Sequence, residues 1–273
     1  MAKVSVKDLL ADIQALFQKI HPDDLDGFAK LTQDRIQQQQ PYDWTGRVLI
    51  EGVVKWLHIE SSPEAQENGD VLWHGLITDI TAAKQMEEEV RQLAFYDPLT
   101  KLANRRLLND RLSQSISAGK RNGLYSALIF LDLDNFKPLN DAHGHVAGDL
   151  LLIEVANRLK SCVREIDTVA RIGGDEFVVL LSQLNVDKAE SNSLAGLVAE
   201  KIRTALAEPY LLTINHEAKE AATVEHRCSA SIGVVMYISH QGTQDDIVQW
   251  ADTAMYEAKE AGRNSIRFYD LKT

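Results

Sequence analysis

Carboxylates gather in two short turns of this sequence, each next to an apolar run. Asp132 and Asp134 end the first run at positions i and i+2, so on a strand both lie on one face while Leu133 packs away. In Gly173-Gly174-Asp175-Glu176 two glycines between apolar runs predict a tight hairpin with the acidic residues at its tip. Side by side, the two turns bring three or four carboxylates together, a ligand set that suits Mg²⁺. Taken singly, each pair is equally typical of a solvated turn.

A basic pair near the carboxyl end of the chain is the second feature that could take part in chemistry. Lys259 and Arg263 stand at i and i+4 of an expected helix and so share one face. Such a pair either balances the neighbouring Glu257 and Glu260 in solvent or binds phosphate groups.

The elements that must position these residues alternate between strand and helix. This order predicts one three-layer domain with a central sheet. The expected strands are 126–132, the hairpin 168–181, 227–237 and 265–269, and the expected helices are 145–163, 194–206 and 245–261. The segment 207–226 is longer and more polar than such a domain requires, and no role is assigned to it.

The first 80 residues predict a smaller α+β unit. Apolar residues recur at helical spacing between 9 and 20, and His21-Pro22-Asp23-Asp24 interrupts them, with Asp23 or Asp24 as a cap for the next helix, 25–36. Strands are expected over 43–50, 54–61 and 71–79, with a hairpin turn at 67–70.

The segment 82–95 predicts a charged helix between the two units. Met86, Val90 and Leu93 follow at +4 and +3, the spacing of a narrow apolar seam. The helix is either an ordinary amphipathic helix or a short parallel coiled coil that joins two protomers, and we favour the dimer.

Composition excludes several classes of protein. The chain has 273 residues and a formal net charge of −11, from 29 Lys plus Arg and 40 Asp plus Glu, so a nucleic-acid-binding module is not expected. No run approaches the ~18–20 apolar residues of a membrane span. Cys162 and Cys228 are expected as core residues in a reducing compartment, and a cytoplasmic location is the default.

Residues 94–270 resemble the GGDEF family of diguanylate cyclases. The resemblance rests on Gly173–Phe177, which spell GGDEF, and on an ordered set of further motifs. These are Asp97-Pro98-Leu99-Thr100 with Leu102-Asn104-Arg105, Asp132 through Asp149, Ser229 to Gly233, and Ala251-Asp252 through Arg263-Asn264. The resemblance implies a central, mostly antiparallel sheet flanked by helices, of the nucleotidyl-cyclase or palm-like type. It also implies a reaction in which two GTP condense to cyclic di-GMP and two pyrophosphates.

The resemblance also implies a role for each site residue. Two Mg²⁺ per site (Mn²⁺ being an alternative) would be held by Asp132, Asp175, Glu176 and the Leu133 carbonyl, with Asp175 or Glu176 accepting a proton. The substrate side would comprise guanine readers, residues around the phosphates and the basic pair. These are Asn140 and Asp149 for guanine; Asn135, Phe136, Lys137, Gly173 and Gly174 around the phosphates; His145, for which helix packing is an equal alternative; and Lys259 and Arg263 at the β- and γ-phosphates.

Arg164 and Asp167 form an RxxD sequence five residues before the hairpin. At this spacing the family resemblance implies an inhibitory site for the product, with Arg164 on guanine or phosphate and Asp167 on the guanine edge.

Residues 20–88 resemble the later part of a PAS sensor domain. The resemblance rests on His21-Pro22-Asp23-Asp24, the Asn68-Gly69 turn and the closing Asp79-Ile80-Thr81. A complete PAS domain has further strands before its helices, so we expect a partial one. The expected organisation is a PAS-like unit over 1–81, a signalling helix over 82–96 and a GGDEF domain over 97–273.

The leading hypothesis is therefore an active, homodimeric diguanylate cyclase. A catalytically silent receptor for GTP or cyclic di-GMP is the main alternative, and an interaction module built on the PAS-like unit is another. The acidic ligands and guanine readers that a silent receptor would lack are all present: Asp132, Asn140, Asp149, Asp175 and Glu176.

Overall fold

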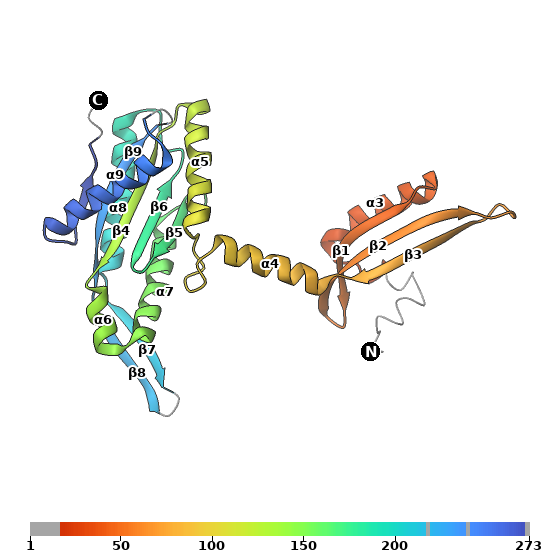
Figure 1. Cartoon of the computed structure of the whole chain (residues 1–273), viewed down its shortest axis with the longest axis horizontal. Helices are drawn as coiled ribbons and strands as arrows, with labels where there is room; N and C mark the ends of the chain where they lie inside the picture. Colours follow the sequence, from red (N-terminus) through yellow and green to blue (C-terminus); the bar gives the residue numbers. More distant parts are fainter. Residues whose placement is uncertain (1–16, 217–218, 239–240, 271–273) are drawn as a thin grey trace. The chain divides into compact units, whose positions relative to one another are not determined.

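The computed structural model of the protein describes residues 17–216, 219–238 and 241–270. The chain divides into two compact units, and the boundary falls between Arg91 and Gln92, inside the helix that connects them (Figure 1). Most of the helix predicted between residues 9 and 20 lies outside the described residues. Ile20, at its end, instead forms a β-bridge with Val48.

The first unit is a helix on a three-stranded antiparallel sheet, as its pattern predicts. The sheet order is β1-β2-β3. The Phe28 ring of α3 packs edge-on against Trp44 of β1 at a centroid distance of 4.8 Å, which anchors the helix on the sheet. The elements are α3 (Pro22–Gln38), β1 (Tyr42–Ile50), β2 (Val53–Ala65), β3 (Val71–Asp79) and α4 (Thr81–Phe95).

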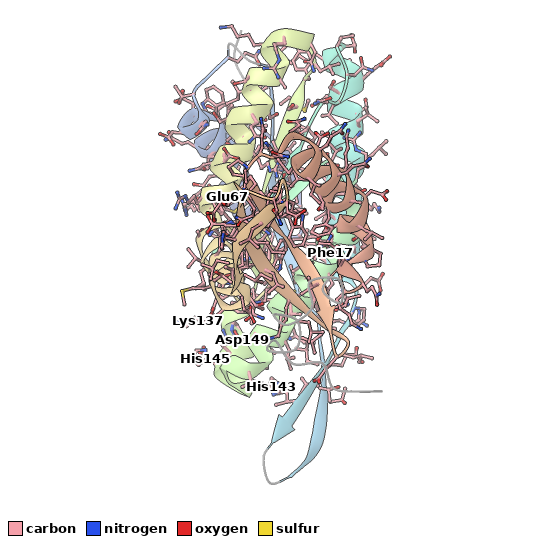
Figure 2. All side chains as sticks on the ribbon, turned by 90° about the vertical axis from the view of Figure 1, so that its right-hand side faces the viewer. Phe17, Glu67, Lys137, His143, His145 and Asp149 are labelled. Atoms are coloured by element: carbon pink, nitrogen blue, oxygen red, sulfur yellow. The ribbon has the colours of Figure 1, made fainter. Side chains whose placement is uncertain are left out.

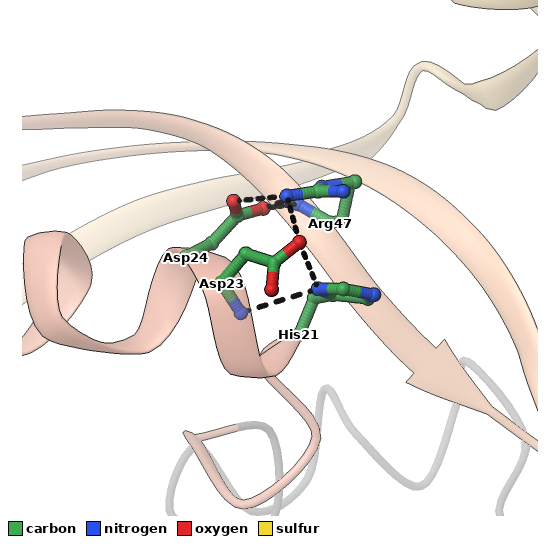
Figure 3. A network of polar contacts seen from close by, with 4 residues as sticks. All are labelled: His21, Asp23, Asp24 and Arg47. Atoms are coloured by element: carbon green, nitrogen blue, oxygen red, sulfur yellow. Dashed lines mark hydrogen bonds and ion pairs between the residues drawn. The ribbon is translucent and has the colours of Figure 1, made fainter.

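A polar cluster joins the start of α3 to β1 (Figure 3). The predicted cap at Asp23 or Asp24 is wrong, because the His21 side chain accepts from the Asp23 amide and is itself the N-cap. The carboxylates in the first turn bind Arg47 instead: Asp24 accepts from its backbone and side chain, with a closest contact of 2.7 Å. These hydrogen bonds from Arg47 hold the pKa of Asp24 below its usual value.

The start of α4 is fastened to β2. The Thr81 hydroxyl contacts the backbone of Trp56, and the Asp79 carboxylate accepts from the Thr81 amide and from Lys55. Bonding to Thr81, and then to Lys55, lowers the pKa of Asp79 to about 2. Further along α4 the apolar seam of Met86, Val90 and Leu93 is exposed in the single chain.

The second unit is a five-stranded sheet covered by helices on both faces, as predicted. The sheet order is β10-β9-β4-β6-β5, antiparallel except for the β9–β10 pair. Helices α5 and α9 cover one face, and α7 and α8 the other. The elements are α5 (Arg105–Asn122), β4 (Ser126–Asp134), α6 (Phe136–His143), α7 (His145–Cys162), β5 (Thr168–Gly173), β6 (Glu176–Leu181), α8 (Lys188–Ala207), β7 (Tyr210–His216), β8 (Lys219–His226), β9 (Ser229–Tyr237), α9 (Gln244–Glu260) and β10 (Ile266–Phe268).

Two helices and one two-stranded hairpin of this unit have no counterpart in the sequence prediction. The buried stripe of helix α5 consists of two leucines together with Ser115 and Gly119. This stripe is too weakly apolar for the helical period to be recognised in the sequence. Helix α6 is eight residues long and contains Pro138. Strands β7 and β8 form a separate two-stranded hairpin within the unassigned segment 207–226.

Two simpler expectations can be compared with the structure. Cys162 and Cys228 are buried, as expected of core residues. Among the helices that the structure describes, none is long and apolar enough to cross a membrane.

Candidate active site

The end of β4 and the turn between β5 and β6 bring the predicted acidic residues together. Asp132 stands directly opposite Glu176 in the β4–β6 ladder, so both side chains lie on one face of the sheet. The Leu133 amide donates to the Asp175 carbonyl at 3.2 Å, which fastens the hairpin turn to β4. Gly174 supplies the left-handed φ of 51° that closes this two-residue turn. The hairpin therefore lies beside β4, which is the arrangement under which the two acidic turns meet.

Glu176 lies in an environment that disfavours its charge. Burial raises its pKa above the usual range, and the carboxylates of Asp132, Asp252 and Asp175 raise it further, while Arg105 opposes the shift. Excess negative charge is thus concentrated at the hairpin tip. A cation bound there would relieve this repulsion.

Asp132 is paired with the predicted phosphate-binding lysine. The Lys259 Nζ lies 2.8 Å from Asp132 Oδ2, and the Asp132 side chain is only 12% exposed. Burial raises the pKa of Asp132 and the charge on Asp175 adds to the rise, whereas the hydrogen bond from Lys259 lowers it. Anionic and cationic parts of the site are therefore in direct contact.

The donor set is compatible with a divalent cation that also binds phosphate groups. Within the described residues, three His, Cys or carboxylate ligand atoms lie within 4.8 Å of one another only at the exposed cluster Asp43, His58 and Glu60 of the first unit. The ligand atoms of Asp132, Asp175 and Glu176 are thus more widely spaced. Mg²⁺ is commonly held by one or two carboxylates plus phosphate oxygens rather than by an all-protein cage, so the wider spacing is compatible with it.

Asp134, the second aspartate of the first turn, has a structural role. It is 2% exposed and accepts hydrogen bonds from the hydroxyls of Ser229 and Ser231 and from the Asn264 amide. Three carboxylates rather than four therefore remain for cation binding. Through Asn264, Asp134 also fixes the loop that carries Arg263.

The expectation that Lys259 and Arg263 share a helix face is wrong. Helix α9 ends at Glu260, and Gly262, with a φ of 111°, turns the chain out of the helix. Arg263 follows with a left-handed φ of 65°. Only Lys259 lies in the last helical turn, where a cation is favoured by the helix dipole.

The predicted guanine readers lie on α6 and α7. Asn140 Oδ1 is buried without a hydrogen-bond partner, and it rests against Gly148, where an added Cβ would collide with it. Asp149 follows Gly148 and is exposed. A buried amide oxygen without a hydrogen-bond partner is rare in folded proteins, and a donor group on a ligand would satisfy it.

The remaining substrate-side residues lie around the same two helices. Figure 2 shows Lys137 of α6 at the same end of the unit as His145 and Asp149 of α7. Asn135 precedes α6 with a φ of 62°, a conformation that asparagine tolerates well. Phe136 packs on the core, and His145 is the exposed first residue of α7.

Arg164 and Asp167 line a separate hollow of about 990 Å³, which Arg111, Arg121 and Lys160 also line. The Asp167 side chain is 1% exposed and accepts from Arg164 and from the Ser182 amide. The Arg164 side chain is 57% exposed. Asp167 thus faces inward and orients the exposed Arg164 side chain.

Arg171 is a site residue to which the sequence assigned no role. Its guanidinium contacts the Asp97 carboxylate at 3.1 Å and donates to the Gly174 carbonyl at 2.8 Å. Asp97 in turn accepts from the amide and hydroxyl of Thr100. The position of Arg171 beside the hairpin glycines was the only signal in the sequence.

Fold and site define an α/β domain with carboxylates and cations gathered at one end of its sheet, an arrangement suited to phosphate chemistry. The family described as "Diguanylate cyclase, GGDEF domain" matches residues 94–265. The chain belongs to this family.

Individual relatives agree with this assignment. The bifunctional diguanylate cyclase/cyclic di-GMP phosphodiesterase MucR of Pseudomonas aeruginosa is 44% identical over 190 residues, 70% of this chain and 26% of MucR. The crystal structure of the GGDEF domain of PA1120 (YfiN or TpbB) from Pseudomonas aeruginosa matches with a TM-score of 0.55 and 36% identity, covering 63% of this chain and 99% of that one. The coiled coil and GGDEF domain of DgcB from Caulobacter crescentus, in complex with c-di-GMP, matches with a TM-score of 0.58 and 26% identity, covering 69% and 93%. The chain thus spans about a quarter of the length of MucR.

Proposed function

We propose that this protein is a diguanylate cyclase that condenses two GTP into cyclic di-GMP. The observation that carries the proposal is the pairing of Asp132 with Glu176 across β4 and β6, with the Lys259 ammonium 2.8 Å from Asp132. Carboxylates for a metal and a cation for phosphate thus meet at one strand end, within a domain of the cyclase family.

In each half-reaction the 3′-oxygen of one GTP forms a bond to the α-phosphorus of the other. The bond between that phosphorus and the oxygen that bridges to the β-phosphate breaks, and pyrophosphate leaves. Asp132, Asp175, Glu176 and the Leu133 carbonyl would hold Mg²⁺, two ions per site, which supply positive charge to the α-phosphate and the leaving group. The 3′-hydroxyl proton passes to Asp175 or Glu176, the two carboxylates at the turn of the hairpin.

The chain's own residues select and orient the substrate. Asp149 accepts from guanine N1–H and N2–H, and the Asn140 amide donates to O6, a pattern that adenine does not match. Lys259 and Arg263 bind the β- and γ-phosphates. Each site holds one GTP, so two protomers face each other.

The apolar seam of α4 supports the homodimer. Met86, Val90 and Leu93 are each more than half exposed in the single chain, an arrangement stabilised when a second copy covers them. The first unit, a partial PAS-like sensor, adjusts this pairing through α4. Its last strand is fastened to the start of α4 by Asp79 and Thr81.

Product inhibition is part of the proposal. Cyclic di-GMP binds the hollow beside Arg164, whose exposed guanidinium is held in place by Asp167. Four further basic side chains, Lys101, Arg111, Arg121 and Lys160, line this hollow and complement the phosphates of the product.

Turnover of GTP with Mg²⁺, with the nucleotides separated by chromatography, tests the function. The wild-type protein is expected to form cyclic di-GMP and pyrophosphate, whereas Glu176→Gln, which keeps the shape of the side chain, is not. Circular dichroism checks that the variant is folded. GTP binding without product, at protein concentrations that drive dimerisation, would favour the silent receptor.

A further inference from the structure

The ion pair between Lys259 and Asp132 has a consequence for how the site fills. We propose that Lys259 is an internal counter-ion of Asp132 that a divalent cation displaces, and that the released lysine then binds the triphosphate, so that cation and nucleotide bind cooperatively. Because it concerns the same site, this proposal rests on the cyclase function proposed above.

The contact is close and partly shielded from solvent. Nζ lies 2.8 Å from Oδ2, and the side chains of Lys259 and Asp132 are 31% and 12% exposed. Two cations at one small carboxylate repel each other, and less solvent screens that repulsion here than at an open surface. A divalent ion on Asp132 and the ammonium of Lys259 therefore compete for the same group.

The surroundings allow the lysine to move while its helix stays in place. Lys259 lies in the last turn of α9 and ends in a flexible four-carbon chain, so Nζ can exchange partners without a backbone shift. Arg263 differs, because it lies beyond the helix end in the loop that the Asn264 amide fastens to Asp134, and the ion pair to Asp132 is made by Lys259. In this proposal Lys259 exchanges Asp132 for phosphate, whereas Arg263 binds phosphate only.

Displacement couples the two binding events. A cation that binds first releases Lys259 for the phosphates, and a nucleotide that binds first withdraws Lys259 from Asp132. By linkage, each ligand raises the affinity of the other by the same factor.

Binding of Mn²⁺ without nucleotide, followed through the electron paramagnetic resonance signal of the free ion, tests the proposal. Lys259→Met removes the counter-ion and keeps the length of the side chain. It is expected to tighten Mn²⁺ binding at least about fivefold, the lower end of typical coupling factors. Arg263→Met removes an equal charge that has no contact with Asp132, and it is expected to change Mn²⁺ affinity by less than about twofold, as for independent sites.

The second arm repeats the titration with a non-hydrolysable GTP analogue. In the wild type the analogue should raise Mn²⁺ affinity, and in Lys259→Met this increase should shrink. Equal Mn²⁺ affinity in wild type and Lys259→Met, equal tightening in Arg263→Met, or no Mn²⁺ binding by any of the three would overturn the proposal. If the wild type forms no cyclic di-GMP although Lys259→Met tightens Mn²⁺ binding, only the proposed function fails.

Discussion

Arg171 joins Asp97, two residues beyond the linker helix, to the carbonyl of Gly174 in the acidic hairpin. The guanidinium reaches Asp97 at 3.1 Å and Gly174 with two N–H groups, at 2.8 and 3.0 Å. Both side chains of the ion pair are largely buried. The residue that positions the hairpin therefore also touches the segment through which α4 enters the domain.

Replacing Arg171 tests this connection. Arg171→Met should lower kcat roughly ten- to a hundredfold, because small displacements of reacting groups carry costs of that size. Arg171→Lys retains a charge for Asp97 but loses the forked contact with Gly174, so it should recover thermal stability more than turnover. Steady-state kinetics and melting curves on all three proteins provide the comparison, and wild-type kcat in Arg171→Met would contradict the assigned role.

Gly148 is predicted to be required for the guanine readers. A Cβ at this position would collide with the Asn140 side chain and lie 3.1 Å from Phe136 Cζ. Gly148→Ala should displace Asn140 and raise the KM for GTP roughly threefold to tenfold, the equivalent of one net hydrogen bond. Gly196→Ala is the matched control, because a Cβ in that helix meets only Phe268, at an ordinary 3.6 Å. An equal effect of both substitutions on KM would refute the prediction.

Because the pKa of Glu176 is raised, replacing this residue by neutral glutamine should stabilise the protein by an amount that depends on pH. A carboxyl whose pKa is raised by folding favours the native state below its unfolded pKa, and this contribution is lost as the pH rises through the folded value. In the presence of a chelator that removes divalent cations, Glu176→Gln should therefore have a higher melting temperature than the wild type at about pH 8. This difference in melting temperature should vanish towards about pH 4. A difference in melting temperature that does not change with pH would contradict this cause.

Arg164 is expected to control product inhibition. Arg164→Ala should raise the concentration of cyclic di-GMP needed for half-inhibition at least about tenfold, as for loss of a charge-assisted contact. Lys120→Ala, an exposed lysine of α5 that does not line the hollow, serves as the control. Asp167→Asn should weaken inhibition too, because Asp167 orients Arg164. Inhibition of Arg164→Ala at wild-type concentrations would exclude this site.

The seam of α4 predicts the oligomeric state. Val90→Glu adds a charge at the centre of the seam and should shift the protein towards monomer, with a matching loss of turnover at low protein concentration. Gln85→Glu adds the same charge at an exposed position away from the seam. Analytical ultracentrifugation should separate the two variants, and an undisturbed dimer in Val90→Glu would place the interface elsewhere.

Local patterns in the sequence were sufficient for much of this architecture. The hairpin at Gly174, the buried strand that carries Asp132 and most of the long helices of the second unit follow from turn chemistry and apolar period, which act between near neighbours. Where the period was weak the prediction failed. Helix α5 was not predicted, because two of the four residues in its buried stripe are Ser115 and Gly119.

The roles of individual charges were decided only by the tertiary structure. Asp132 and Asp134 look equivalent in sequence, yet one meets Lys259 and the other is enclosed by Ser229 and Ser231, from a strand almost a hundred residues away. Asp167 is likewise turned inward. The alternation along a strand determines the face of the sheet on which a side chain lies. The groups that this side chain contacts come from strands and loops distant in sequence. Those contacts decide whether a carboxylate is available to a ligand or stabilises the fold.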